Sequence, residues 1–164
     1  MKRAALILTW GLLFLLTTGI AALRTTAAVK AWIRPVSTDK CPVCGMFVSK
    51  YPDWTAEIVF NDGSYVVFDG AKDMFVFYFD IRKYSPSKKR EDIATIYVTD
   101  YYAVTSVDAR SAYYVSGSDV HGPMGKELVP FAKESDARGF KADHRGRALL
   151  TFDAITPDIL KDLK

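Results

Sequence analysis

The chain has few residues that bind transition metals, with only two cysteines and two histidines among its 164 residues. Cys41 and Cys44 are three positions apart, so a disulfide between them would close a very small loop and add little stability to the fold. A framework of structural disulfides is therefore disfavoured. A high aromatic content of 13% lets a single domain of this size bury a core without such bridges. Chemistry is the better explanation of the pair.

The sequence also lacks a strong charge of either sign and any constellation typical of catalysis. The net charge is +3, and the basic run Lys88-Lys89-Arg90 is followed at once by Glu91-Asp92, which is typical of a solvated loop. Nucleic-acid binding is therefore not expected. Neither a nucleophile–base pair nor paired catalytic carboxylates occur at a meaningful spacing, so we do not expect an enzyme.

The N-terminus predicts export from the cytoplasm. Basic residues at positions 2 and 3 precede an uncharged run from Ala4 to Leu23, which as a helix would extend about 30 Å, enough to cross a bilayer. The segment 1–23 is either a cleaved signal peptide or an uncleaved membrane anchor. The basic residues favour a cytoplasmic N-terminus with the rest of the chain outside. No cysteine stands at the end of the run, so a lipoprotein anchor is not expected here.

The segment 24–40 is polar and irregular and is interpreted as a linker. The remainder predicts two successive units of similar composition, each with two strands, a helix and a third strand. The elements expected in the first unit are strands at 54–60 and 64–68 around an Asn-Asp-Gly turn, a helix at 71–79 with Asp69 as its N-cap, and a strand at 92–99.

In the second unit we expect strands at 111–115, 127–131 and 148–152, a helix at 133–144, a turn-rich loop from Gly117 to Gly125, and a last helix that begins at Thr156-Pro157. Both halves therefore read as ββαβ. The sequence predicts an α+β fold of two small related lobes.

The cysteine motif predicts a site for a soft metal ion. Cys41 and Cys44 supply two thiolates on one tight loop, Gly45 allows a sharp turn, and Met46 adds a thioether. Thiolate and thioether are soft donors that suit copper(I), whereas zinc seldom uses methionine. A methionine alone is as often a core residue, so Met46 is meaningful because it accompanies the cysteines.

A second group of candidate ligands lies far along the chain. His121 and Met124 fall in the Gly117–Gly125 segment, and loops held by a rigid scaffold commonly carry binding groups. Taken singly, His121 is expected to be a solvated histidine and Met124 a core residue. If the two lobes pack together, this segment could bring an imidazole and a thioether to the cysteines. His144, at the end of a predicted helix, is interpreted as a charge partner of the helix terminus.

Three separated motifs resemble the nitrous oxide reductase accessory protein family, NosL. They are Cys-Pro-Val-Cys-Gly-Met46, Phe-Asp-Gly-Ala-Lys-Asp-Met74 and Gly-Ser-Asp-Val-His-Gly-Pro-Met-Gly125, and the closing Phe152–Thr156 is also similar. The resemblance implies a periplasmic copper(I) chaperone that loads nitrous oxide reductase with the help of a membrane transporter complex. It also implies lobes related to the organomercurial lyase fold.

By the same resemblance, Cys44 and Met46 would be ligands with Cys41 beside them, and residues 41–164 would form the copper-binding domain. Many family members are lipoproteins anchored through a cysteine, which this chain lacks after its apolar run. Any anchor would then be the segment 4–23, and the client could be another copper enzyme.

Two other functions are consistent with the cysteine pair. A thiol–disulfide oxidoreductase needs an attacking cysteine with a lowered pKa, commonly at a helix N-terminus, and Gly45 directly after Cys44 is a poor helix start. A structural zinc site could combine the cysteines with His121 and His144. That set fits no compact zinc finger and leaves the methionines unexplained.

Overall fold

The computed structural model describes residues 32–163. The predicted signal peptide or anchor, 1–23, lies outside the described residues, as does the first part of the predicted linker, 24–31. Among residues 32–163, no helix has the length and apolar character needed to cross a bilayer.

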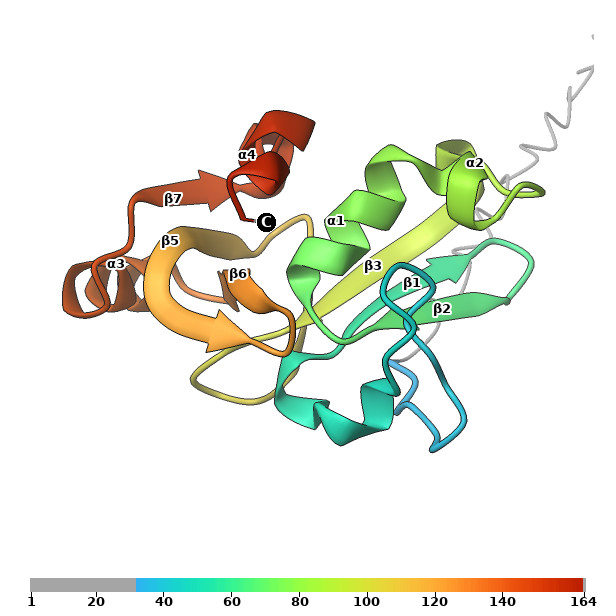
Figure 1. Ribbon diagram of the computed structural model, residues 1–164, viewed down its shortest axis with the longest axis horizontal. Helices are drawn as coiled ribbons and strands as arrows, with labels where there is room; N and C mark the ends of the chain where they lie inside the picture. The colour runs from blue at the N-terminus through green and yellow to red at the C-terminus, as the bar shows by residue number, and fades with distance from the viewer. Residues whose placement is uncertain (1–31, 164) are drawn as a thin grey trace, which may run out of the picture.

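The first lobe is built on an antiparallel sheet of four strands (Figure 1). The strands are β1 (Ala56–Phe60), β2 (Tyr65–Phe68), β3 (Ile93–Thr99) and β4 (Ser106–Asp108), in the order β2-β1-β3-β4. The β1–β2 hairpin confirms the prediction from the Asp-Gly turn, where Gly63 takes the positive φ of 83° that L-residues avoid. Every residue of β1 is buried.

Helix α1 (Ala71–Phe79) packs across this sheet and is followed by the short α2 (Ile81–Tyr84) (Figure 1). The helix was predicted, but its N-cap was not: Gly70 occupies the cap position and makes no side-chain cap bond. The expectation for Asp69 was wrong because its carboxylate faces a cysteine instead of the helix N–H groups. Short 3-10 helices complete the connections at Val48–Lys50, Pro52–Trp54, Arg90–Asp92 and Phe152–Ala154.

The second lobe repeats the order strand, strand, helix, strand. Its antiparallel sheet has the order β6-β5-β7, and the helices are α3 and a terminal α4. The Thr156 hydroxyl accepts the backbone N–H of Ile159 at 3.4 Å, which confirms the predicted cap. The bounds are β5 (Tyr113–Gly122), β6 (Gly125–Phe131), α3 (Glu134–Asp143), β7 (Ala148–Thr151) and α4 (Pro157–Lys161).

The prediction of a loop from Gly117 to Gly125 was wrong. Strand β5 continues to Gly122 and pairs again with β6, although its register shifts between Ser116 and His121. Gly117 has a φ of 71°, so the irregularity lies within a strand, as in a β-bulge. Only the two residues between Gly122 and Gly125 form the turn. The segment His121–Lys126 is called the hairpin tip below.

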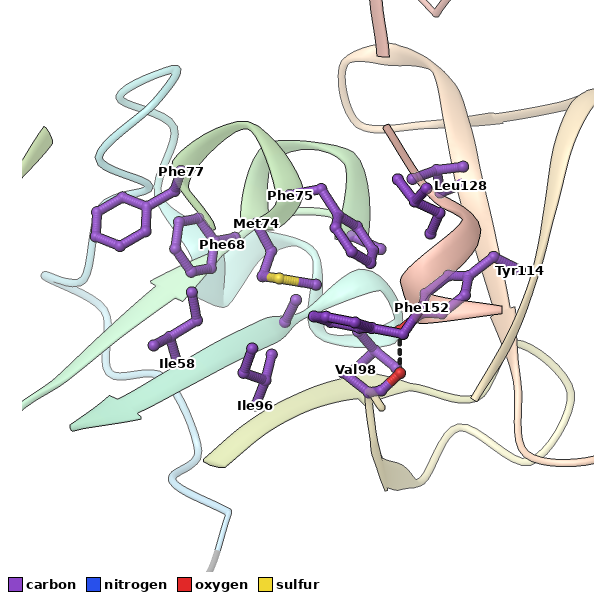
Figure 2. Packing of buried hydrophobic residues seen from close by; sticks show 14 of the residues in the cluster. Ile58, Phe68, Met74, Phe75, Phe77, Ile96, Val98, Tyr114, Leu128 and Phe152 are labelled. Atoms are coloured by element: carbon purple, nitrogen blue, oxygen red, sulfur yellow. Dashed lines mark hydrogen bonds between the residues drawn. The ribbon is translucent and has the colours of Figure 1, made fainter. Parts of the chain in front are cut away.

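The two lobes share one hydrophobic core, because the paired segments of β5 and β6 nearest α1 are buried on both faces. Tyr114 and Leu128 pack into the cluster formed by α1 and the first sheet, together with Phe152 (Figure 2). Their neighbours Val115 and Val129 point the other way and form a smaller cluster with α3 residues. This arrangement confirms the α+β fold of two ββαβ lobes and fixes the hairpin tip relative to α1.

Candidate metal centre

The cysteine loop is closed by backbone hydrogen bonds at both ends. The N–H of Cys41 donates to the carbonyl of Met46 at 2.9 Å, and the N–H of Gly45 donates to the carbonyl of Cys41 at 2.8 Å. Gly45 has a φ of 81°, as the tight turn requires. Backbone N–H groups of Val43 and Cys44 face the sulfur of Cys41, and that of Met46 faces the sulfur of Cys44. The loop therefore presents both sulfurs within a ring of amide donors that can stabilise thiolates.

Two carboxylates face the two thiols from the start of α1. The Sγ of Cys44 donates to Oδ1 of Asp69 at 3.2 Å, and the Sγ of Cys41 donates to Oδ2 of Asp73 at 3.4 Å. One ligand atom from each of these four residues lies within 4.8 Å of the others. Asp73 lies in the first turn of α1 and Asp69 directly precedes its N-cap, Gly70, so both carboxylates come from the start of this helix.

Burial of this cluster disfavours its charged forms. It raises the pKa of Cys44 to about 12 and that of Cys41 further, and it also raises the pKa of Asp73. Both thiols are free and hold their protons at neutral pH. The second oxygen of Asp69, Oδ2, is buried without a hydrogen-bond partner. A cation among these groups would offset the cost of that unsatisfied oxygen and of any thiolates formed.

A hollow of about 460 Å³ opens beside Cys44 and is lined by both lobes. Met124 lies on its rim at 47% exposure, so the turn of the hairpin tip and the cysteine loop border one space. The remaining walls come mainly from helices α1 and α2 and from the C-terminal segment. The lining residues are Val43, Cys44, Lys72, Asp73, Val76, Tyr84, Met124, Leu160 and Leu163.

Two other predicted ligands lie outside this arrangement. His121 is exposed on β5, paired with Lys126, and is not among the residues that line the hollow. Met46 is half-buried and is not among the residues that line the hollow, and its carbonyl accepts the N–H of Cys41. Copper binding by either side chain stays a prediction.

The histidines do not join the cysteines in a zinc-type set within residues 32–163, because the group of metal-ligating atoms there contains neither of them. His144 follows α3 and its Nδ1 lies 3.1 Å from Oδ1 of Asp119, while its ring stacks on Phe140. The His144 ring thus pairs with an acidic side chain of β5, and its interpretation as a charge partner of the helix terminus stays a prediction.

Sequence reasoning missed the carboxylates of the site. Asp69 was interpreted as a helix cap and Asp73 was not singled out, although both lie in the motif that ends at Met74. Their position at a predicted helix start was a usable signal, since it brings two carboxylates to one end of the helix. The direction in which they point is set by the packing of α1 on the sheet.

The two-lobed α+β fold and the cluster of soft and acidic donors define a small metal-binding protein. The chain belongs to the NosL family of copper-binding chaperones, because the family model described as NosL matches residues 33–160. It is 30% identical over 159 residues to the copper-binding lipoprotein NosL of Stutzerimonas stutzeri, and the match covers 90% of this chain and 80% of the relative. This relative is described as a copper-binding lipoprotein and the solved structure reported next as a copper chaperone, and neither is described as an enzyme.

A solved structure has the same fold. The crystal structure of the copper chaperone NosL from Shewanella denitrificans superposes with a TM-score of 0.66 at 26% sequence identity, covering 80% of this chain and 99% of that chain. The resemblance found from the motifs is therefore confirmed at the level of sequence and of structure.

Proposed function

We propose that this protein is an extracytoplasmic copper(I) chaperone that delivers the ion for the maturation of nitrous oxide reductase or a related copper enzyme. The observation that carries this proposal is that the half-buried thiol of Cys44 and the exposed thioether of Met124 line the same hollow, with the buried Cys41 beside them. Soft donors that converge from two lobes suit a soft monovalent cargo.

The proposed ligand set is graded in exposure, which suits transfer. Cys41 is buried, Cys44 is half-buried and Met124 is exposed on the open side of the hollow. A thiolate, thioether or imidazole of a partner can therefore replace the Met124 thioether first and reach the cysteines afterwards. Met46 and His121 are proposed as further ligands that would have to turn toward the ion.

Loading requires that the thiols lose their protons. Because burial raises the pKa of both cysteines, copper(I) has to displace protons that are firmly held at pH 7. Apparent copper affinity should therefore rise with pH, by up to about two log units per pH unit when both cysteines bind as thiolates. The same raised pKa values disfavour thiol–disulfide exchange, which uses cysteines of lowered pKa.

The proposed partners are the copper-enzyme client and a membrane transporter complex of the same maturation system. The segment 4–23 would hold the protein at the outer face of the inner membrane if it is not cleaved. A relative described as a lipoprotein supports a membrane-associated location.

The test is copper(I) titration of the reduced protein against a competing chelator. We expect one copper(I) per chain, with affinity weakened by Cys44→Ser and by Met124→Ala. Val104→Ala is the matched control, since its apolar side chain is as exposed as that of Met124 but lies outside the hollow.

Met46→Ala and His121→Ala decide whether those residues are ligands. An affinity unchanged by Met124→Ala would confine the site to the cysteine loop. A protein that binds no copper(I) but reduces a model disulfide would reject the chaperone function in favour of the oxidoreductase.

A further inference from the structure

Lys72 is a buried lysine that joins the first turn of α1 to the hairpin tip. Its side chain is only 7% exposed, and Nζ donates to the carbonyl of Met124 at 3.1 Å and to the carbonyl of Lys126 at 2.8 Å. One ammonium group thus binds the backbone of the turn and of the strand β6 that follows it. Hydrogen bonds from a charged donor are among the stronger ones in proteins.

The backbone of Lys72 makes a second connection to the same hairpin. Its N–H donates to Oε1 of the fully buried Glu127 at 2.5 Å, and the same oxygen accepts the N–H of Leu128 at 2.8 Å. Gly70 leaves the space that this requires, since a Cβ there would lie 2.2 Å from Oε2 of Glu127. The start of α1 therefore contacts the hairpin through both backbone and side chain.

The hairpin tip needs such support because its own ladder is interrupted. The pairs of His121 with Lys126 and of Gly122 with Gly125 are separated from the rest of the β5–β6 ladder by the register shift that begins at Ser116. A two-residue turn beyond a bulge has few internal contacts that fix its direction. The two bonds from Lys72 supply that direction.

The segment 69–73, which contains Lys72, also faces the cysteines. Asp69 and Asp73 flank Lys72 and accept from the thiols of Cys44 and Cys41. The geometry points to Lys72 as a positioning residue of the metal centre: it holds the Met124 turn beside the cysteine loop, so that thioether and thiolates reach one ion. This inference rests on the proposed function where it treats Met124 as a ligand.

Its test compares Lys72→Leu with the wild-type protein, both as the full-length reduced chain. Lys72→Leu keeps an apolar side chain, removes the ammonium donors and adds no sulfur ligand to the hollow that Lys72 lines. The first measurement is the backbone ¹⁵N order parameter at Met124 and Gly125, which reports how firmly the hairpin tip is held. The second is copper(I) affinity.

We expect Lys72→Leu to lower these order parameters and to weaken copper(I) binding about 10- to 100-fold, as is typical when a group that orients a ligand is removed. In the Met124→Ala background the same change should have little further effect, because Lys72 acts through Met124. Lys126→Gln is the matched control: this exposed lysine of the hairpin tip reaches only the carbonyl of Asp162, at 3.3 Å, and its loss should leave both measurements unchanged.

Order parameters at Met124 and Gly125 that are unchanged in Lys72→Leu would overturn the inference, as would equal losses of affinity with and without Met124. If Met124→Ala alone leaves copper(I) affinity unchanged, the proposed ligand set fails, whereas the order parameters still decide whether Lys72 fixes the turn. Should Lys72→Leu not fold, Lys72→Gln replaces it in the same comparison, because its shorter side chain cannot reach both carbonyls.

Discussion

The Sγ of Cys44 lies 3.2 Å from Oδ1 of Asp69, so the more accessible thiol of the metal centre donates its proton to a buried carboxylate. This contact opposes ionisation of the thiol, as burial does, and keeps the metal-free cysteine protonated. The arrangement suits a site that should react with its metal but not with oxidants or other thiols.

Replacing Asp69 with asparagine should make Cys44 more reactive. The change removes a negative charge beside the sulfur and so lowers the pKa of Cys44, and each unit of decrease raises the thiolate fraction about tenfold near neutral pH. The measurement is the rate of alkylation by iodoacetamide at pH 8. Asp62→Asn is the control, because that exposed carboxylate bonds Lys88 and Ser64 and should leave the rate unchanged. A slower reaction in Asp69→Asn would contradict the role of the carboxylate.

Glu127 should make the stability of the protein decrease with pH. Burial raises the pKa of Glu127 from 4.5 to about 8, so between these values the folded chain keeps a proton that the unfolded chain has released. Its contribution is complete below pH 4.5 and is lost as the pH rises through 8, at up to about 1.4 kcal/mol per pH unit.

Glu127→Gln, which keeps the oxygen acceptor and cannot ionise, should remove this slope. Urea unfolding from pH 5 to pH 9 measures the free energy of both proteins. Curves that run parallel across this range would exclude Glu127 as the source of the dependence.

Local signals in the sequence were enough to predict most of the fold. The Asp62-Gly63 turn, the Thr156-Pro157 cap and the apolar runs each specify an element through interactions among near neighbours. Strand β5 was cut short at Val115 because glycine and proline in the next ten residues are typical of a loop. Pairing with β6 overrides that local preference and makes the segment a bulged strand.

The candidate site was predictable only in part. The cysteines were identified from their chemistry. Met124 was identified because the sequence contains other soft donors that could bind the same ion. Asp69, Asp73 and Lys72 were missed because their roles depend on the rotation of α1 about its axis and on the position of the second lobe, which no local pattern encodes.

Two methionines should separate sharply in their effect on stability. Met74 is fully buried in α1 between the aromatic residues of the core (Figure 2), whereas Met124 is half-exposed on the hollow. We expect Met74→Ala to lower the free energy of unfolding by about 2–5 kcal/mol and Met124→Ala by less than about 0.5 kcal/mol. Denaturant unfolding of the metal-free proteins measures both. A large loss from Met124→Ala would assign that side chain a structural role.

Two glycines should respond to alanine in opposite directions. At Gly70 the added Cβ would lie 2.2 Å from Oε2 and 3.0 Å from Cδ of Glu127, so the buried carboxylate must move and we expect a loss of about 1–3 kcal/mol. At Gly139, inside α3 with open space around it, alanine should stabilise the protein by about 0.5–1 kcal/mol. Melting temperatures that rise in both variants would show that the contact between Gly70 and Glu127 is not tight.

The sharing of Tyr114, Leu128 and Phe152 between the lobes has a consequence for how the chain is made. Synthesis proceeds from the N-terminus, so the cysteine loop and α1 emerge before the strands that complete the core around them. Until residues 113–152 have followed, the part of α1 that packs on the second lobe remains uncovered and the turn that carries Met124 does not yet exist. The thiols are thus produced well before their thioether neighbour, and a half-synthesised chain has no finished place for its cargo.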